Sequence, residues 1–103
     1  MAKQKTISYK ELEKMLGTFT YTENFPSLRS DKKVANQFIL HYNNGIVFQS
    51  YKSIIAVKVN GNLYLTPAHD YSNTTSKYCT QFTGYPTQER RQMIEEGEIN
   101  LIA

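Results

Sequence analysis

The sequence contains one cysteine, no tryptophan and no long apolar run among its 103 residues. The single cysteine, Cys79, excludes a disulfide framework and a cysteine-based zinc site within one chain. No apolar run approaches the ~20 residues that a transmembrane helix requires. The first residues, Met1 to Lys5, lack the apolar stretch of a signal peptide. We therefore expect a protein of the cytoplasm, a reducing compartment, with no membrane partner.

A strong excess of charge of either sign is also lacking. The formal net charge is +3 and the isoelectric point is about 9.0. Lysine and arginine are spread along the chain, whereas nucleic-acid binders often concentrate them on one face. This balance permits contact with nucleic acid without arguing for it, and it argues against a DNA mimic. The length is that of one domain, so we expect a single domain over residues 1–103.

Three segments have the pattern of helices. Ser8 and Glu11 have the spacing of a capping box, and Asp70 or Ser72 can cap a second helix. Glycine follows each segment and supplies the left-handed residue that commonly ends a helix. The three helices are expected at residues 8–16, 70–83 and 87–96.

Alternation of apolar and polar residues over 34–66 predicts about four antiparallel strands. We interpret Asn43 to Gly45 as a three-residue hairpin loop with Gly45 left-handed, which pairs Tyr42 with Ile46. Residues 18–22 have the composition of a further short strand, and residues 23–33 are predicted to be a loop.

The Asn60–Gly61 hairpin leaves two registers open. A two-residue turn pairs Val59 with Asn62, and a three-residue loop pairs Val59 with Leu63 and gives the better apolar face. Because strands cluster rather than alternate with helices, we predict an α+β fold. It consists of an N-terminal helix, an antiparallel meander of about four strands, two C-terminal helices, and a short C-terminal strand or tail.

Residues for catalysis are few. Cys79, His69 and Asp70 contain the elements of a nucleophile, a base and an orienting group. However, adjacent side chains such as His69 and Asp70 usually point apart, and Cys79 lies among apolar positions of a helix, which favours a buried, inert thiol. His41 and His69 are isolated and weak as metal ligands. We therefore expect no enzyme, no cofactor and no metal.

The segment Asp70 to Phe82 is the strongest candidate for binding. Small polar side chains gather at its helix start, where free backbone N–H groups favour anions, although the same residues are also favoured simply as caps. A basic loop is a further candidate. The predicted partner-binding residues are Tyr71, Ser72, Asn73, Thr74, Thr75 and Lys77 at the helix start, and Arg29, Lys32 and Lys33 in the loop.

A second candidate surface combines aromatic and basic residues on the predicted sheet. Its members are Tyr42, Phe48, Tyr51, Lys52, Lys58 and Tyr64. Nucleobases stack on aromatic rings while lysines hold phosphates. Tyr51, Lys58 and Tyr64 can lie on one face of the sheet, but the favoured interpretation is that several of these rings belong to the core.

Part of the sequence resembles a family of small, largely uncharacterised proteins from phages and prophages of Gram-positive bacteria. The resemblance covers about residues 42–97, and its most specific part is the run DYSNTTSKY. It rests on Gln49 to Tyr51, Ile54 to Ala56, Gly61, Leu63 to Leu65, Asp70 to Tyr78 and Phe82. No catalytic residue is implied by it.

The resemblance implies a small phage-type accessory protein in the cytoplasm of a host bacterial cell. Such a protein is expected to bind and inhibit or regulate a host macromolecule, foremost a defence factor such as a CRISPR-Cas or restriction nuclease or its complex. The alternatives are a nucleic-acid-binding protein and a sponge for a small anionic nucleotide held near Ser72. An exposed edge strand can also support a homodimer.

Overall fold

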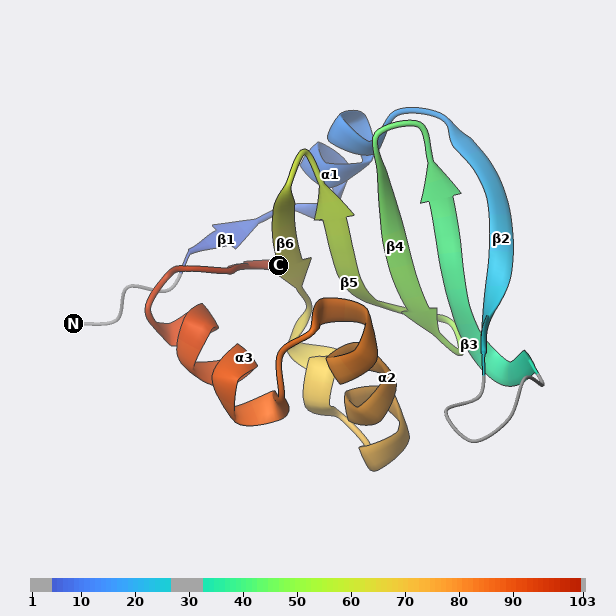
Figure 1. The fold of residues 1–103 in the computed structure, drawn as a ribbon. Coiled ribbons are helices and arrows are strands. Elements are labelled where there is room, and N and C mark those ends of the chain that lie inside the picture. Colours follow the sequence, from blue (N-terminus) through green and yellow to red (C-terminus); the bar gives the residue numbers. More distant parts are fainter. Residues whose placement is uncertain (1–4, 27–32, 103) are drawn as a thin grey trace.

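The computed structural model describes residues 5–26 and 33–102 (Figure 1). In this part of the chain, seven strands form one mixed sheet in the order β1-β7-β6-β5-β4-β3-β2. The elements are β1 (Thr6–Ile7), α1 (Tyr9–Leu16), β2 (Phe19–Pro26), β3 (Lys33–Tyr42), β4 (Gly45–Ser50), β5 (Ser53–Val59), β6 (Asn62–Leu65), the 3-10 helix η1 (Pro67–Asp70), α2 (Asn73–Thr83), α3 (Thr87–Glu95) and β7 (Asn100–Ile102).

The predicted fold, an N-terminal helix with a four-stranded antiparallel meander, is wrong. The C-terminal segment forms β7, which inserts between β1 and β6 and runs parallel to both. Parallel neighbours need a long crossover connection, and here η1, α2 and α3 supply it between β6 and β7. Because no short turn joins such strands, the local signals that mark a hairpin were missing for them.

The predicted loop over residues 23–33 is also only partly correct. β2 continues to Pro26 and pairs antiparallel with β3, which places it at the open edge of the sheet. Residues 27–32 lie outside the described chain. Two register shifts interrupt the pairing of β2 with β3, and bulges of this kind discourage edge-to-edge association. The homodimer stays a prediction.

The three predicted helices are confirmed within one to three residues at their ends. Ser8 Oγ accepts a hydrogen bond from the Glu11 backbone N–H at 3.3 Å and so begins α1. Ser72 caps α2 in the same way, and Gly84 ends it in the left-handed region at φ 82°. Among the described residues, no helix is both long and apolar enough to cross a bilayer.

Both central hairpins have two-residue turns. The predicted three-residue loop at Asn43–Gly45 is wrong, whereas at Asn60–Gly61 the two-residue alternative is the one formed. Tyr42 pairs with Gly45, and Val59 pairs with Asn62. Asn60 and Gly61 carry the turn at φ 54° and 79°, as a primed hairpin turn requires. Gly45 is needed for a different reason, because a Cβ atom there would lie 2.2 Å from the Lys58 backbone oxygen.

The sheet is covered on both faces, which explains why the register with more apolar residues on one face is not the one formed at the Asn60–Gly61 hairpin. One face packs on α1 and the other on α2 and α3 (Figure 1). The α1 face buries Leu12, Leu16, Val47, Val57, Val59, Tyr64 and Ile102. The opposite face buries Phe25, Phe48, Ile55, Ala56, Leu65, Tyr78, Cys79, Phe82, Ile94 and Ile99. Strands buried on two faces read as continuous apolar runs, so a register chosen to make one apolar face was misleading.

We expect Gly45→Ala to destabilise the fold by about 3 kcal/mol, because the new methyl group overlaps backbone and the Leu16 side chain. Gly61→Ala is the control, since a Cβ atom at Gly61 would meet no other atom within 4 Å and only its positive φ is unfavourable, at a cost of about 1 kcal/mol. Urea unfolding of both variants measures the difference. A smaller loss at Gly45 than at Gly61 would contradict the close approach of β4 to β5.

Candidate functional site

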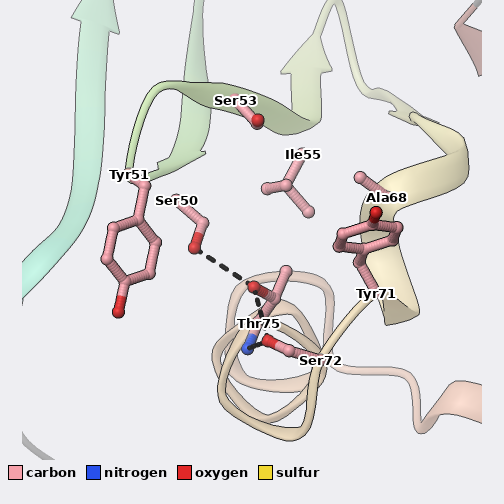
Figure 2. Close-up of a pocket in the computed structure, with 8 residues that line it drawn as sticks. All are labelled: Ser50, Tyr51, Ser53, Ile55, Ala68, Tyr71, Ser72 and Thr75. Atoms are coloured by element: carbon pink, nitrogen blue, oxygen red, sulfur yellow. Dashed lines mark hydrogen bonds between the residues drawn. The ribbon is translucent and has the colours of Figure 1, made fainter.

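A pocket opens between the turn that joins β4 to β5 and the start of α2 (Figure 2). Its volume is about 210 Å³, and it is lined by Ser50, Tyr51, Ser53, Ile55, Ala68, Tyr71, Ser72 and Thr75. Figure 2 shows the two tyrosines on opposite sides, with the hydroxyl groups of Ser50, Ser72 and Thr75 between them. The pocket is therefore formed by the sheet on one side and by η1 and α2 on the other.

Hydroxyl groups connect the two sides of the pocket. Ser72 Oγ accepts from the Thr75 N–H at 3.1 Å and donates to Thr75 Oγ1 at 3.1 Å. Thr75 Oγ1 in turn lies 3.1 Å from Ser50 Oγ in β4. The bond between Thr75 and Ser50 fixes the start of α2 on the end of the sheet.

The hydrogen bonds among these hydroxyl groups do not use all of their hydrogens. The Ser72 hydrogen goes to Thr75, and the bond between Thr75 and Ser50 uses only one of their two hydrogens. The first N–H groups of a helix also lack intrahelical acceptors. Ser72 satisfies the N–H of Thr75, whereas Asn73 and Thr74 precede it in the first turn. The start of α2 thus offers hydrogen-bond donors in and beside the pocket.

Polar side chains replace the apolar core at this end of the sheet. Ser50, Thr75 and Gln37 are all buried, and Gln37 pairs with Ser50 across the strands. Among the described residues, Gln37 Oε1 finds no hydrogen-bond partner. An unsatisfied buried acceptor costs about 1–3 kcal/mol. The buried Gln37 therefore costs stability at this end of the sheet.

Tyr51 adopts an unusual backbone conformation at the edge of the pocket. Its φ is 56°, in the left-handed region that glycine and asparagine tolerate far better than tyrosine. A hydrogen bond from its N–H to the Asn36 backbone oxygen (2.6 Å) holds it there. The comparable turn at Asn60–Gly61 uses the favoured residues. Tyr51 is 59% exposed, so core packing does not account for the choice of tyrosine.

A buried arginine holds the other side of the pocket in place. Arg90 of α3 is completely buried. It donates to His69 Nδ1 (3.0 Å), the His69 oxygen (3.1 Å), Thr80 Oγ1 (2.8 Å), the Tyr85 oxygen (2.8 Å), Ser76 Oγ (2.9 Å) and Thr87 Oγ1 (3.2 Å). Because these acceptors belong to η1, α2, α3 and the loop between the helices, Arg90 fixes η1, and with it Tyr71, relative to α2.

Burial and the neighbouring charges shift the pKa values of two side chains of η1, His69 and Asp70. Burial lowers the pKa of His69, and the neighbouring Arg90 and Arg91 lower it further against the opposing charge of Asp70. The neutral ring is the form that accepts from Arg90 Nε. Burial alone raises the pKa of Asp70, but the hydrogen bond from Arg91 and the nearby positive charges lower it overall. Asp70 and Arg91 form an ion pair with 2.7 Å between Oδ2 and Nη2.

The pocket unites only part of the predicted binding segment. Tyr71, Ser72 and Thr75 line it, and Tyr71 is 86% exposed. Asn73 and Thr74 are exposed on the first turn, and Lys77 lies over the Tyr78 ring at 5.9 Å, away from the lining. Arg29 and Lys32 lie outside the described residues, as does the side chain of Lys33.

The sequence did not point to the β4–β5 hairpin as part of this site. Ser50, Ser53, Ile55 and Ala68 were not candidates, and Tyr51 was assigned to another surface. A signal existed in Tyr51 itself, because a tyrosine between Ser50 and Lys52 occupies a tight turn where smaller residues are usual.

The candidate surface of aromatic and basic residues is not formed, and the favoured interpretation, that several of its rings belong to the core, is confirmed. Phe48 is buried under α2 and α3, whereas Tyr64 is buried under α1. Lys58 lies on the Phe48 side, with its Nζ 4.8 Å from the centre of the Phe82 ring. Tyr51, Lys58 and Tyr64 therefore do not share a face of the sheet.

Cys79 is a buried thiol, as the sequence predicted. It is fully buried in α2, and burial raises its pKa to about 11 despite the opposing charge of Arg90. His69 Nδ1 is already engaged by Arg90. The arrangement of these residues therefore does not activate the thiol as a nucleophile. Within residues 5–26 and 33–102, no group of three or more histidine, cysteine or acidic residues could hold a metal.

Comparison with known proteins finds a match at the level of a family. A family model described as a family of unknown function (DUF8033) matches residues 2–99. No curated protein and no solved structure matches the chain. The match covers nearly all of the sequence and includes every residue that lines the pocket.

We expect Tyr51→Asn to raise the free energy of unfolding by about 1 kcal/mol, because asparagine tolerates a positive φ better than tyrosine. Tyr71→Asn is the matched control. Tyr71 is also exposed, but its backbone is right-handed at φ −64°, so there is no strain to relieve. Urea unfolding compares the two. An equal effect at both positions would show that Tyr51 is not strained.

We also expect the protein to lose stability as the pH falls below about 6.5, the ordinary pKa of histidine. Since the folded state lowers the pKa of His69, the unfolded chain binds the proton first. The contribution of neutral His69 to the free energy of unfolding is complete above this pH. It is lost as the pH falls toward the lower pKa of His69 in the folded state, by at most about 1.4 kcal/mol per pH unit.

Urea unfolding at about pH 7.5 and about pH 5 measures this loss. His69→Gln, which does not titrate, should flatten the dependence between these values. His41→Gln is the control, because His41 lies in β3 beside Glu23 and away from Arg90. A steep dependence that survives in His69→Gln would assign the effect to other groups.

Proposed function

Because the chain belongs to this family of unknown function, we propose its function from the site: it binds a partner protein through the surface around the Tyr51–Tyr71 pocket. The role is recognition rather than catalysis. The pocket, the exposed tyrosines beside it and the start of α2 make up the proposed contact surface.

The observation that carries the proposal is the exposure of two tyrosines on opposite sides of one pocket. Tyr51 is 59% exposed and Tyr71 is 86% exposed. Tyrosine offers a large rigid ring and a hydroxyl group at a small entropic cost, and it is enriched at the centres of protein interfaces. Both rings project from tight backbone structures, a hairpin turn and the end of η1, which favours a preformed surface.

The unfavourable backbone of Tyr51 supports the same conclusion. A strained residue persists when something other than local conformation requires it, and such residues gather at functional sites. Here the requirement falls on the side chain, because Asn60–Gly61 shows that this chain uses favoured residues at a comparable turn. A role in contacting a partner accounts for a tyrosine at position 51.

The resemblance to phage and prophage proteins suggests the kind of partner. We propose that the protein acts as a phage-type accessory protein that inhibits or regulates a host bacterial protein, foremost a defence nuclease or its complex. The run from Asp70 to Tyr78, the most specific part of the resemblance, contributes Tyr71, Ser72 and Thr75 to the pocket. The proposed contact surface and the resemblance therefore meet in the same residues.

Two alternatives receive less support from the site. A site for an anionic nucleotide would favour a lysine or arginine in its lining. The pocket has neither. Several basic side chains of the described chain are also engaged internally: Arg90 is buried, Arg91 pairs with Asp70, and Lys58 lies over Phe82. Nucleic-acid binding is therefore the second candidate, recognisable by an affinity that falls steeply with salt.

The proposal predicts that a photoreactive phenylalanine analogue at position 71 or position 51 crosslinks the same protein in Gram-positive bacterial cells. Position 21 is the matched control. Tyr21 is 55% exposed, but it lies on β2, stacked on His41 and outside the pocket lining. Mass spectrometry of the adducts identifies the partner and its contact residues.

The outcomes separate the candidates. One protein attached at positions 51 and 71, with little at position 21, supports the proposed surface. Equal adducts at all three positions, or none at positions 51 and 71, would reject it. An adduct that nuclease digestion removes would instead support the nucleic-acid alternative.

A further inference from the structure

We infer that the pocket receives one uncharged aromatic side chain with a polar edge, such as tyrosine, from the partner protein. This inference rests on the proposed function and deepens it, because it names what enters the site. The occupant's ring lies between Tyr51 and Tyr71, and its polar edge meets the hydroxyl groups of the lining.

The size of the pocket favours a side chain over a free ligand. Sites for small molecules and cofactors usually enclose roughly 300–1,000 Å³, and this pocket encloses about 210 Å³. A nucleotide, with a base, a sugar and a phosphate, needs more space than this. A single side chain anchored in a small pocket is the usual form of a strong contact in a protein interface.

The lining favours an uncharged occupant. It combines two aromatic rings, the apolar Ile55 and Ala68, and the hydroxyl groups of three serines and a threonine. None of its side chains carries a charge at neutral pH. A lysine entering here would lose water without gaining a counter-ion, which is unfavourable. An aromatic ring can pack edge-to-face or offset against the tyrosines.

The hydroxyl groups favour a polar edge on that ring. One hydrogen of the Ser50–Thr75 pair is left over, and Ser53 adds a further hydroxyl group to the lining. A hydroxyl group donates or accepts by rotation, so a phenol oxygen or an indole N–H finds a partner here. A purely aliphatic side chain would leave these groups without one.

The test is a titration of the ¹⁵N-labelled protein followed by NMR, with blocked amino acids as probes. N-acetyl-tyrosinamide should shift the amide signals of residues 50–53 and 68–75 in a saturable way. N-acetyl-phenylalaninamide should bind more weakly, and the leucine and lysine amides weaker still. Adenosine monophosphate tests the anionic alternative. Larger shifts with the lysine amide or the nucleotide would overturn the inference, as would shifts that never saturate.

Two variants guard against a nonspecific effect. Ser53 is exposed in β5, where strands accept aromatic residues, so Ser53→Phe should fill the pocket with its own ring and abolish the shifts. Ser53→Thr, its control, should retain them. Tyr71→Ala removes one side of the pocket at an exposed position and should weaken binding at least tenfold. Unchanged binding in both Ser53→Phe and Tyr71→Ala would overturn the inference.

The inference and the proposed function can fail separately. Crosslinking of one protein at positions 51 and 71 without binding of aromatic amides would leave the surface in place and reject only the aromatic occupant. Saturable binding of the amide with no crosslinked protein would support the pocket's chemistry and reject the protein partner.

Discussion

The buried guanidinium of Arg90 is the contact on which the arrangement of the helices depends. It donates to side-chain and backbone oxygens of η1, α2, α3 and the intervening loop, and to the ring nitrogen of His69. None of these acceptors is a carboxylate, and the nearby Asp70 is paired with Arg91. A buried charge is tolerated only when its hydrogen bonds are satisfied. Lysine has three donors and no planar fork, so it could not replace Arg90.

This cluster matters for the pocket because the pocket's two sides belong to different layers. Tyr51 lies in the turn between two strands of the sheet, whereas Tyr71 and Ser72 follow η1, whose position Arg90 and His69 fix. The layers meet through the Ser50–Thr75 hydrogen bond and through aromatic contacts, including Phe48 against Phe82 with 5.8 Å between ring centres. The spacing of the two tyrosines is thus set by the packing of the helices on the sheet, not by flexible loops.

Signals from neighbouring residues correctly predicted the helix ends. Ser8, Ser72 and Gly84 cap helices as expected, because capping depends on residues within one turn. The position of β7 depends on pairing with strands that are distant in the sequence. No hairpin turn joins β7 to its parallel neighbours, so no short sequence signal marks the pairing. For the site, the polar helix start was found through Ser72 and Thr75. The β4–β5 hairpin was missed, because the meeting of Tyr51 with Tyr71 depends on how the crossover folds back on the sheet.

Gly45 illustrates how a correct residue was given the wrong cause. The sequence shows a glycine after two asparagines, which is a turn signal, and the left-handed loop was a reasonable interpretation. In the structure the glycine begins β4, where the lack of a side chain lets Lys58 and Leu16 approach. The same caution applies in reverse to Tyr51. Its turn does require a positive φ, yet the residue is not the one that conformation favours, so its explanation must come from the side chain. Where a residue opposes its local conformation, function is the better explanation, and this is why the proposed contact surface includes Tyr51, in the turn between β4 and β5.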